Sequence, residues 1–283
     1  MKANFSVKKD VEDVCDCLQI SETEFANNAS MSLKTLRDAC NGKFTNKTLE
    51  KIYSSIYEAG IRLNAAKVEL LEERTQPGHT LLFHGSKGGI DCLSENGSRP
   101  NCDFGPGFYC SQLYSSALCF IETYDYSSIY VLDIDLDGLS CAHIPPSLDW
   151  MIIVCYFRQM LNKYEAHPVL KSSLEKIRGK DVIIAPIADN RMFQIMREFG
   201  EGNITDVEAI HALSASRLGY QYVFKSKNAL ERIVFSDRFF CSSKERQNSA
   251  RNTLERKSAI DTKLLLAKRE FRGKGVYVDE VLK

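Results

Sequence analysis

The stretch that decides the fold is residues 79–109, which read HTLLFHGSKGGIDCLSENGSRPNCDFGPGFY. Its short apolar start predicts a strand that stops at His84 and Gly85. Glycine has no Cβ, so a ligand can come close to the backbone at that point. The stretch ends in DFGPGFY, residues 103–109, a glycine-containing turn that delivers the ring of Tyr109. Each half alone is more often plain structure, whereas the two together indicate a ligand site.

Two later segments extend the pattern. Residues 181–193, DVIIAPIADNRMF, begin with a continuous β-branched run, which predicts a strand in the interior of a sheet. Asp189 follows at a helix N-cap position, ahead of apolar residues at helical spacing. Residues 219–224, GYQYVF, predict a further strand that carries Gln221. Strands and helices interleave without a regular βαβ rhythm, so the expected fold class is α+β.

These segments resemble the ADP-ribosyltransferases of the diphtheria-toxin and poly(ADP-ribose) polymerase type. Those enzymes hold NAD with a His-Gly pair and a Gly-x-Gly-x-Tyr segment, and a third strand carries a catalytic glutamate. More closely, the chain resembles a bacterial branch of that superfamily, domain-of-unknown-function family 3990, with which it shares residues 181–193. The resemblance covers residues 79–283 and implies an ADP-ribosyltransferase-like split β-sandwich with helices over that range.

The resemblance also implies roles for individual residues, with NAD as the substrate and no metal. His84 would hydrogen-bond the adenosine ribose, and neutral imidazole suits a hydroxyl partner because it can both donate and accept. Gly85 would bind the nicotinamide carboxamide through its backbone, and Ser86 would assist there. Tyr109 would stack on the nicotinamide ring.

The third position departs from the family pattern, because Gln221 stands where the better-known members have glutamate. An amide can hydrogen-bond the nicotinamide ribose but brings no negative charge to a developing cation. In the eukaryotic relatives, loss of this glutamate accompanies transfer of a single ADP-ribose, so Gln221 argues against polymer formation.

Gln221 leaves two alternatives, weak catalysis or a different catalytic acid. Asp189 is the candidate for that acid, with a helix N-cap as its alternative role. Arg191 is a candidate partner for a pyrophosphate or for Asp103, with a surface salt bridge as the alternative. For Asp103 itself, the alternative is that it only holds the turn before Tyr109.

Bulk properties narrow the class of protein. The 283 residues carry 37 Lys or Arg and 37 Asp or Glu, so net charge points to neither nucleic acid nor membrane. The N-terminus lacks an apolar signal core and no apolar run is long enough to span a bilayer, which predicts a cytoplasmic protein. The ten cysteines include no Cys-x-x-Cys pair, so free thiols are expected rather than zinc ligands.

Residues 1–75 predict a small all-α domain ahead of the predicted catalytic domain at 79–283. Ser21 and Glu24 have capping-box spacing, and the pattern resembles the helix-turn-helix of Xre-type repressors, with residues 32–41 as recognition helix. Residues 21–48 would then contact DNA or a protein. Residues 1–64 hold nine basic and nine acidic residues, so the basic footprint of a DNA reader is missing.

Further elements are expected along the chain. A third N-terminal helix begins near residue 46 and continues to Arg74, and the sequence TQPG at 75–78 breaks it. Residues 275–278 could add an edge strand. Helices are expected near 112–120, 147–157 and 243–268, and strands at 128–137 and 233–240, where alternation or apolar runs support them.

The leading expectation is a mono-ADP-ribosyltransferase that cleaves the nicotinamide–ribose bond of NAD and modifies a protein or nucleic acid. A helical domain fused to such an enzyme suggests a toxin–antitoxin, phage-defence or regulatory setting. A second reading is a regulator or binding module that senses NAD or ADP-ribose without turnover, which Gln221 favours. A third is an NAD glycohydrolase. Repressor-like helical domains often dimerise, so a homodimer is also considered.

Overall fold

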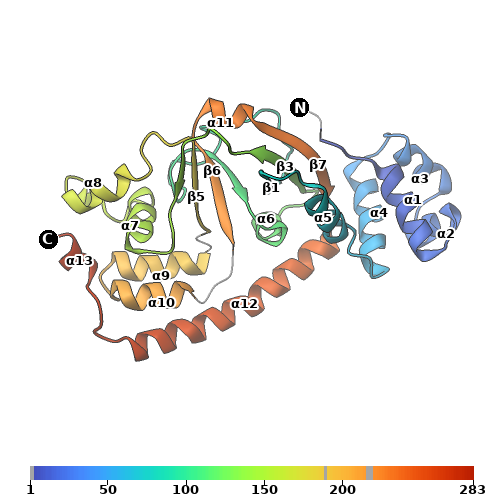
Figure 1. Ribbon diagram of the computed structural model, residues 1–283. Helices are drawn as coiled ribbons and strands as arrows, with labels where there is room; N and C mark the ends of the chain where they lie inside the picture. Colours follow the sequence, from blue (N-terminus) through green and yellow to red (C-terminus); the bar gives the residue numbers. More distant parts are fainter. Residues whose placement is uncertain (1–2, 188–189, 215–218) are drawn as a thin grey trace. The chain divides into compact units, whose positions relative to one another are not determined.

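The structure is a computed structural model that describes residues 3–187, 190–214 and 219–283. The protein is α+β, with a helical N-terminal region followed by mixed strands and helices (Figure 1). Its contacts divide it into two compact units, each assembled from segments distant in sequence. The first unit comprises residues 1–92, 114–135 and 234–252, and the second comprises 93–113, 136–233 and 253–283.

Five helices open the chain, and their polar caps explain where most of them begin. Ser21 and Glu24 form the predicted capping box, and the hydroxyls of Ser32 and Thr45 cap the third and fourth helices. A buried cluster that includes Phe25, Leu36 and Ile52 holds the helices together. The helices are α1 (Val7–Leu18), α2 (Glu22–Asn28), α3 (Leu33–Cys40), α4 (Asn46–Glu58) and α5 (Leu63–Arg74).

The expectation of one continuous helix from residue 46 to Arg74 is wrong. Helix α4 ends at Glu58, and Gly60 adopts a φ of 89°. That left-handed conformation is easy for glycine and ends the helix in the manner of an ordinary C-terminal cap. A new helix, α5, then starts at Leu63, and the predicted break at 75–78 ends it.

The first unit also holds three strands among the described residues: β1 (His79–Ser86), β3 (Ser128–Asp135) and β7 (Ile233–Phe240). Strand β3 lies between the other two and pairs antiparallel with β1, which sets His84 opposite Tyr130. Helix α6 (Tyr114–Ile121) covers β1. The far end of β7 reaches the core of the N-terminal helices, where the rings of Phe240 and Tyr53 lie 5.4 Å apart.

A buried carboxyl group joins the first unit's helices at the start of α12 (Ser243–Glu270). The Tyr114 hydroxyl donates to Glu245 Oε1 at 2.6 Å, and the Asn64 side-chain amide donates to Oε2 at 2.8 Å. Burial raises the pKa of Glu245, and the two hydrogen bonds oppose that rise. Glu245 therefore keeps its proton to a higher pH in the folded protein than in the unfolded chain.

We expect this group to make the unfolding free energy fall with pH. Between the usual glutamate pKa and the raised folded pKa, the folded state binds more protons than the unfolded state, so stability decreases as the pH rises through that window. Glu245→Gln should remove this part of the slope in urea titrations from about pH 4 to about pH 7. Glu255→Gln, an exposed site on the same helix, is the control and should retain the slope. If the unfolding free energies of wild type and Glu245→Gln changed with pH in parallel, Glu245 would not be the group responsible for the slope.

The second unit is built on four strands within the described residues: β2 (Phe108–Ser111), β4 (Cys141–His143), β5 (Val182–Pro186) and β6 (Tyr220–Phe224). They lie in the order β4-β5-β6-β2, parallel between β4 and β5 and antiparallel in the other two pairs. Every residue of β5 is buried, which confirms the predicted interior strand.

A large apolar core lies against these strands, centred on α7 (Leu148–Phe157) and α9 (Asn190–Gly200). Trp150 and the five residues after it are buried, which confirms that the apolar helix is internal. Helix α9 lies beside α10 (Asp206–Ser214), which begins at the capping box predicted for residues 205–208 (Figure 1). The remaining elements are the 3-10 helix η1 (Asn162–Tyr164), α8 (Pro168–Glu175), α11 (Lys227–Glu231) and α13 (Val278–Val281).

The expected edge strand at residues 275–278 is wrong, because the segment instead leads into α13. Backbone amides there are used locally: Val276 N donates to the Asp206 side chain, and Tyr277 N donates to Glu280. Val278 is buried in the core of the second unit. In the described part of the chain, no helix has both the length and the apolar character needed to cross a bilayer.

Candidate functional site

His84, Gly85 and Ser86 lie together at the end of β1 in the first unit. A Cβ added to Gly85 would lie 2.8 Å from both the carbonyl oxygen of Ala117 and Cγ2 of Ile121. The residue must therefore be glycine so that α6 can lie close to β1, which is a different reason from the ligand approach expected from the sequence. The Ser86 hydroxyl donates to the carbonyl of Gly89 at 2.7 Å.

Gly85→Ala should destabilise the protein by about 1–3 kcal/mol, because the new methyl group would push α6 away from β1. Gly88→Ala is a matched control, since a Cβ at Gly88 meets no atom within 4 Å. We expect that control to change the unfolding free energy by less than about 0.5 kcal/mol. Equal unfolding free energies for the two variants in urea would contradict the packing argument.

Tyr109 and Gln221 belong to the second unit, on the adjacent strands β2 and β6. Their register pairs Tyr109 with Val223 and Ser111 with Gln221. Residues directly opposite each other share a sheet face, and residues two apart on a strand do so as well. The side chains of Tyr109 and Gln221 are therefore on the same face, the one that carries the Val223 side chain into the core.

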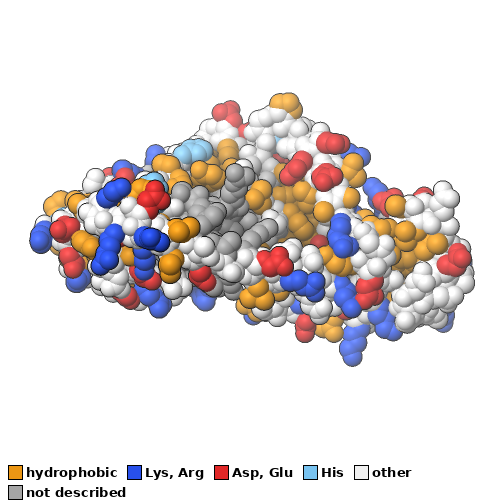
Figure 2. Space-filling model, turned by 90° about the horizontal axis from the view of Figure 1, so that it is seen from below, with side chains coloured by type: hydrophobic (Ala, Val, Ile, Leu, Met, Phe, Trp, Pro, Cys, Tyr) orange, Lys and Arg blue, Asp and Glu red, His pale blue; other side chains and the backbone are white. Residues whose placement is uncertain are grey.

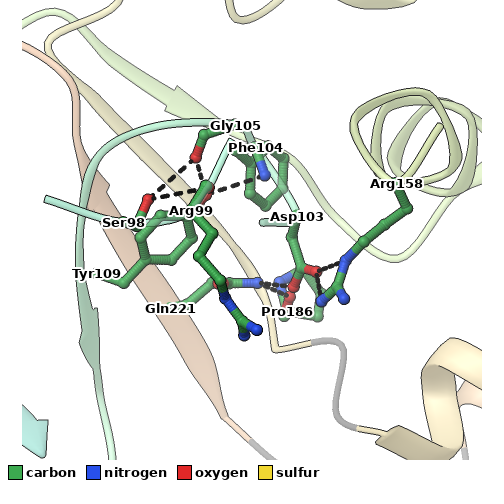
Figure 3. A network of polar contacts seen from close by, with 9 residues as sticks. All are labelled: Ser98, Arg99, Asp103, Phe104, Gly105, Tyr109, Arg158, Pro186 and Gln221. Atoms are coloured by element: carbon green, nitrogen blue, oxygen red, sulfur yellow. Dashed lines mark hydrogen bonds and ion pairs between the residues drawn. The ribbon is translucent and has the colours of Figure 1, made fainter. Parts of the chain in front are cut away.

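The Tyr109 ring packs against this core and its hydroxyl anchors the loop that precedes β2. The hydroxyl donates to the carbonyl of Gly105 at 2.6 Å and accepts from the amide of Phe104 at 3.1 Å (Figure 3). Gly105 has a φ of 72° and lies against the Phe157 ring, so a side chain has neither the conformation nor the space there. Burial raises the pKa of Tyr109 well above its usual range. Stacking of this ring on a nicotinamide stays a prediction.

Gln221 is buried and donates two hydrogen bonds through its side-chain nitrogen. Nε2 lies 2.9 Å from Oδ2 of Asp103 and 2.9 Å from the carbonyl oxygen of Pro186. Asp103 is buried too, and its other oxygen, Oδ1, accepts from Arg158 Nε at 3.0 Å and Nη2 at 2.6 Å (Figure 3). Arg158, Asp103 and Gln221 thus form one chain of contacts that crosses the second unit from the end of α7 to β6.

The contacts among Arg158, Asp103 and Gln221 limit which of their polar atoms can bind a ligand. The carboxylate of Asp103 is paired with a guanidinium, which balances the charge of a buried acid. Both hydrogens of the Gln221 amide have acceptors, so the group that remains for a ligand is its oxygen. The site therefore offers a hydrogen-bond acceptor of fixed orientation beside a charged pair, rather than a free carboxylate.

Lys225 supports the same loop from the end of β6. Its ammonium donates to the carbonyl of Phe104 at 2.8 Å and also to that of Pro106. Burial lowers the pKa of Lys225, and the backbone carbonyls and the Phe157 ring beside the ammonium stabilise its charged form against that effect. The loop from residue 98 to 107 is thus held by Tyr109, Lys225 and the Asp103 contacts.

The sequence did not suggest Arg158 as a site residue. The available signal was a lone arginine directly after a continuous apolar run, residues 150–157, a position that favours a buried partner for its charge. Asp103, which was expected as one possible partner of Arg191, has Arg158 as an observed partner. Asp189 lies outside the described residues, as does the side chain of Arg191. Over the ranges that the structure describes, no group of three or more His, Cys, Asp or Glu side chains could hold a metal ion.

A comparison with known families shows the family of this chain. The family model described as "Protein of unknown function (DUF3990)" matches residues 80–235, more than half of the chain. The chain belongs to this family. Neither the curated proteins nor the solved structures yielded a match.

Proposed function

We propose that this protein is an NAD-dependent mono-ADP-ribosyltransferase with an ADP-ribosyltransferase-like split β-sandwich. The observation that carries the proposal is the network of the second unit, in which Tyr109 and Gln221 of the resembling motifs lie on one face of adjacent strands. His84 and Gly85, the other motif pair, end a strand of the first unit. Asp103, named from the sequence as a possible partner of Arg191 or as a residue of the turn, adds a buried acid beside Gln221.

In the proposed reaction, the bond between the ribose anomeric carbon and the nicotinamide nitrogen breaks. Its electron pair leaves with nicotinamide, which departs as a neutral molecule, while positive charge develops on the ribose. An acceptor nucleophile on a protein or nucleic acid then bonds to that carbon and releases its proton to water. The enzyme's task is to orient the ribose and stabilise the developing cation.

A test is transfer of label from adenylate-labelled NAD to bacterial lysate macromolecules by the purified full-length protein. We expect labelled material with wild type and much less with His84→Ala. Release of nicotinamide without labelled macromolecules would instead favour an NAD glycohydrolase. If overproduction slows growth of a bacterial host and His84→Ala relieves it, a toxin role gains support; equal growth would count against that role.

A non-catalytic sensor of NAD or ADP-ribose is the second candidate, and a specific observation favours it. Gln221 brings no charge, and its amide hydrogens are already occupied by Asp103 and Pro186. A sensor would bind NAD without releasing nicotinamide. Calorimetric binding together with no detectable product would select this candidate.

For the N-terminal helices we propose contact with a protein rather than with DNA. Arg37, a basic residue on the expected recognition helix, is paired with Glu22 at 3.1 Å. On the face drawn in Figure 2, Lys and Arg side chains are mixed with Asp and Glu over this region, so phosphates would meet both signs of charge. A salt-dependent shift of duplex DNA by the full-length protein would contradict this proposal.

A further inference from the structure

The orientation of the Gln221 side chain is dictated by its neighbours. The two atoms within hydrogen-bond distance of its nitrogen are a carboxylate oxygen of Asp103 and the carbonyl oxygen of Pro186. The carbonyl oxygen has no hydrogen to donate, and neither has the carboxylate of Asp103 in its ionised form, so both atoms act as acceptors. An amide turned by 180° would bring its oxygen to 2.9 Å from two other acceptors, so the observed orientation is the one that satisfies the buried groups.

Arg158 donates two hydrogen bonds to Asp103 and so fixes the position of its carboxylate. The orientation of the Gln221 amide therefore depends on residues outside its own strand, β6. We propose that Asp103 is a positioning residue: it fixes the Gln221 amide so that the oxygen, Oε1, is presented to the ligand. Gln221 then accepts a hydrogen bond from a ligand hydroxyl, such as one on a ribose. Naming the ribose of NAD as this ligand rests on the proposed function.

The same geometry explains why glutamine stands at this position. A glutamate at this position would set one of its oxygens near 2.9 Å from Asp103 Oδ2, the distance now spanned by an N–H hydrogen bond. Two buried carboxylates so close cannot both be ionised without a large cost. Asp103 and Gln221 are thus a matched pair, and the acceptor oxygen of Gln221 does what one oxygen of a glutamate would do.

If Asp103 and Gln221 are a matched pair, restoring glutamate at position 221 should work only when Asp103 is changed as well. Gln221→Glu alone should destabilise the full-length protein at neutral pH and should not raise nicotinamide release. Asp103→Asn combined with Gln221→Glu should recover part of the lost stability, because the amide introduced by the first substitution can donate to the carboxylate introduced by the second. The Pro186 carbonyl still faces that carboxylate, so recovery should be incomplete. The double variant should therefore unfold at higher urea concentration than Gln221→Glu alone, although it carries one more substitution.

Activity distinguishes positioning from simple support of the fold. Asp103→Asn should lower kcat for nicotinamide release by about 10- to 100-fold with KM for NAD little changed, since the orienting contact is a charge-assisted hydrogen bond. The double variant should regain part of that loss. Asp149→Asn is the matched control, because Asp149 also has a basic partner, Lys176, but lies outside the network. That control should leave kcat unchanged.

The outcomes separate this inference from the proposed function. If wild type turns over NAD and Asp103→Asn does so equally well, Asp103 does not position Gln221 and the inference fails alone. If wild type neither binds nor turns over NAD, the proposed function fails, while the urea cycle still decides the pairing. Strictly additive effects of the two substitutions on the unfolding free energy would overturn the pairing itself.

Discussion

Tyr109→Ala is expected to lower the unfolding free energy by about 3 kcal/mol, at the low end of the range for buried aromatic rings because this ring keeps some exposure. The substitution removes the ring from the core beside Val223 and also removes both contacts of its hydroxyl to the loop. Urea unfolding followed by circular dichroism would measure the effect. The loop from residue 98 to 107 should become more susceptible to proteolysis at the same time.

Tyr109→Phe separates the ring from the hydroxyl. It keeps the core contacts but leaves the Phe104 amide without the oxygen that now accepts from it, so we expect a loss of about 1–2 kcal/mol. Equal losses for the alanine and phenylalanine variants would mean that the ring contributes little. In that case the view of Tyr109 as an anchor of the core would be wrong.

Gln221→Ala has the second large expected effect, a fall in nicotinamide release of about 100-fold. The variant removes the acceptor oxygen proposed to orient the ribose, which develops positive charge in the reaction. A hydrogen bond to a charged group is worth about 1.5–3 kcal/mol. It also leaves Oδ2 of Asp103 without its donor, so some loss of stability should accompany the loss of rate.

Rates should therefore be compared well below the unfolding midpoint of each variant. Tyr220→Ala is the control, because Tyr220 precedes Gln221 on β6 and its side chain is exposed. Its turnover should match wild type. If Tyr220→Ala and Gln221→Ala lost activity to the same extent, disturbance of the strand rather than a role for Gln221 would explain both.

Local signals in the sequence predicted much of the fold. The capping box of Ser21 and Glu24, the buried run of β5 and the apolar helix α7 each follow from residues close in sequence. The break between α4 and α5 was missed because apolar residues continue at helical spacing on both sides of Gly60. At that point the left-handed backbone conformation of Gly60 ends the helix, although the apolar spacing is that of a continuous helix.

The candidate site was predictable only in part. Tyr109 and Gln221 were identified through a family resemblance, and their common sheet face follows from strand register, which a single sequence does not specify. The contact of Asp103 with Arg158 joins residues 55 positions apart in the chain, and that of Asp103 with Gln221 joins residues 118 apart. Such pairs arise from tertiary packing, and no local propensity signals them.

The most direct measurement of the central claim is nicotinamide release from NAD by the purified full-length protein, with His84→Ala beside it. We expect steady release by wild type and a loss of at least about 10-fold in the variant, because a hydrogen bond that orients the substrate is removed. Detectable NAD binding without any nicotinamide release by wild type would contradict the enzyme and leave a sensor in its place.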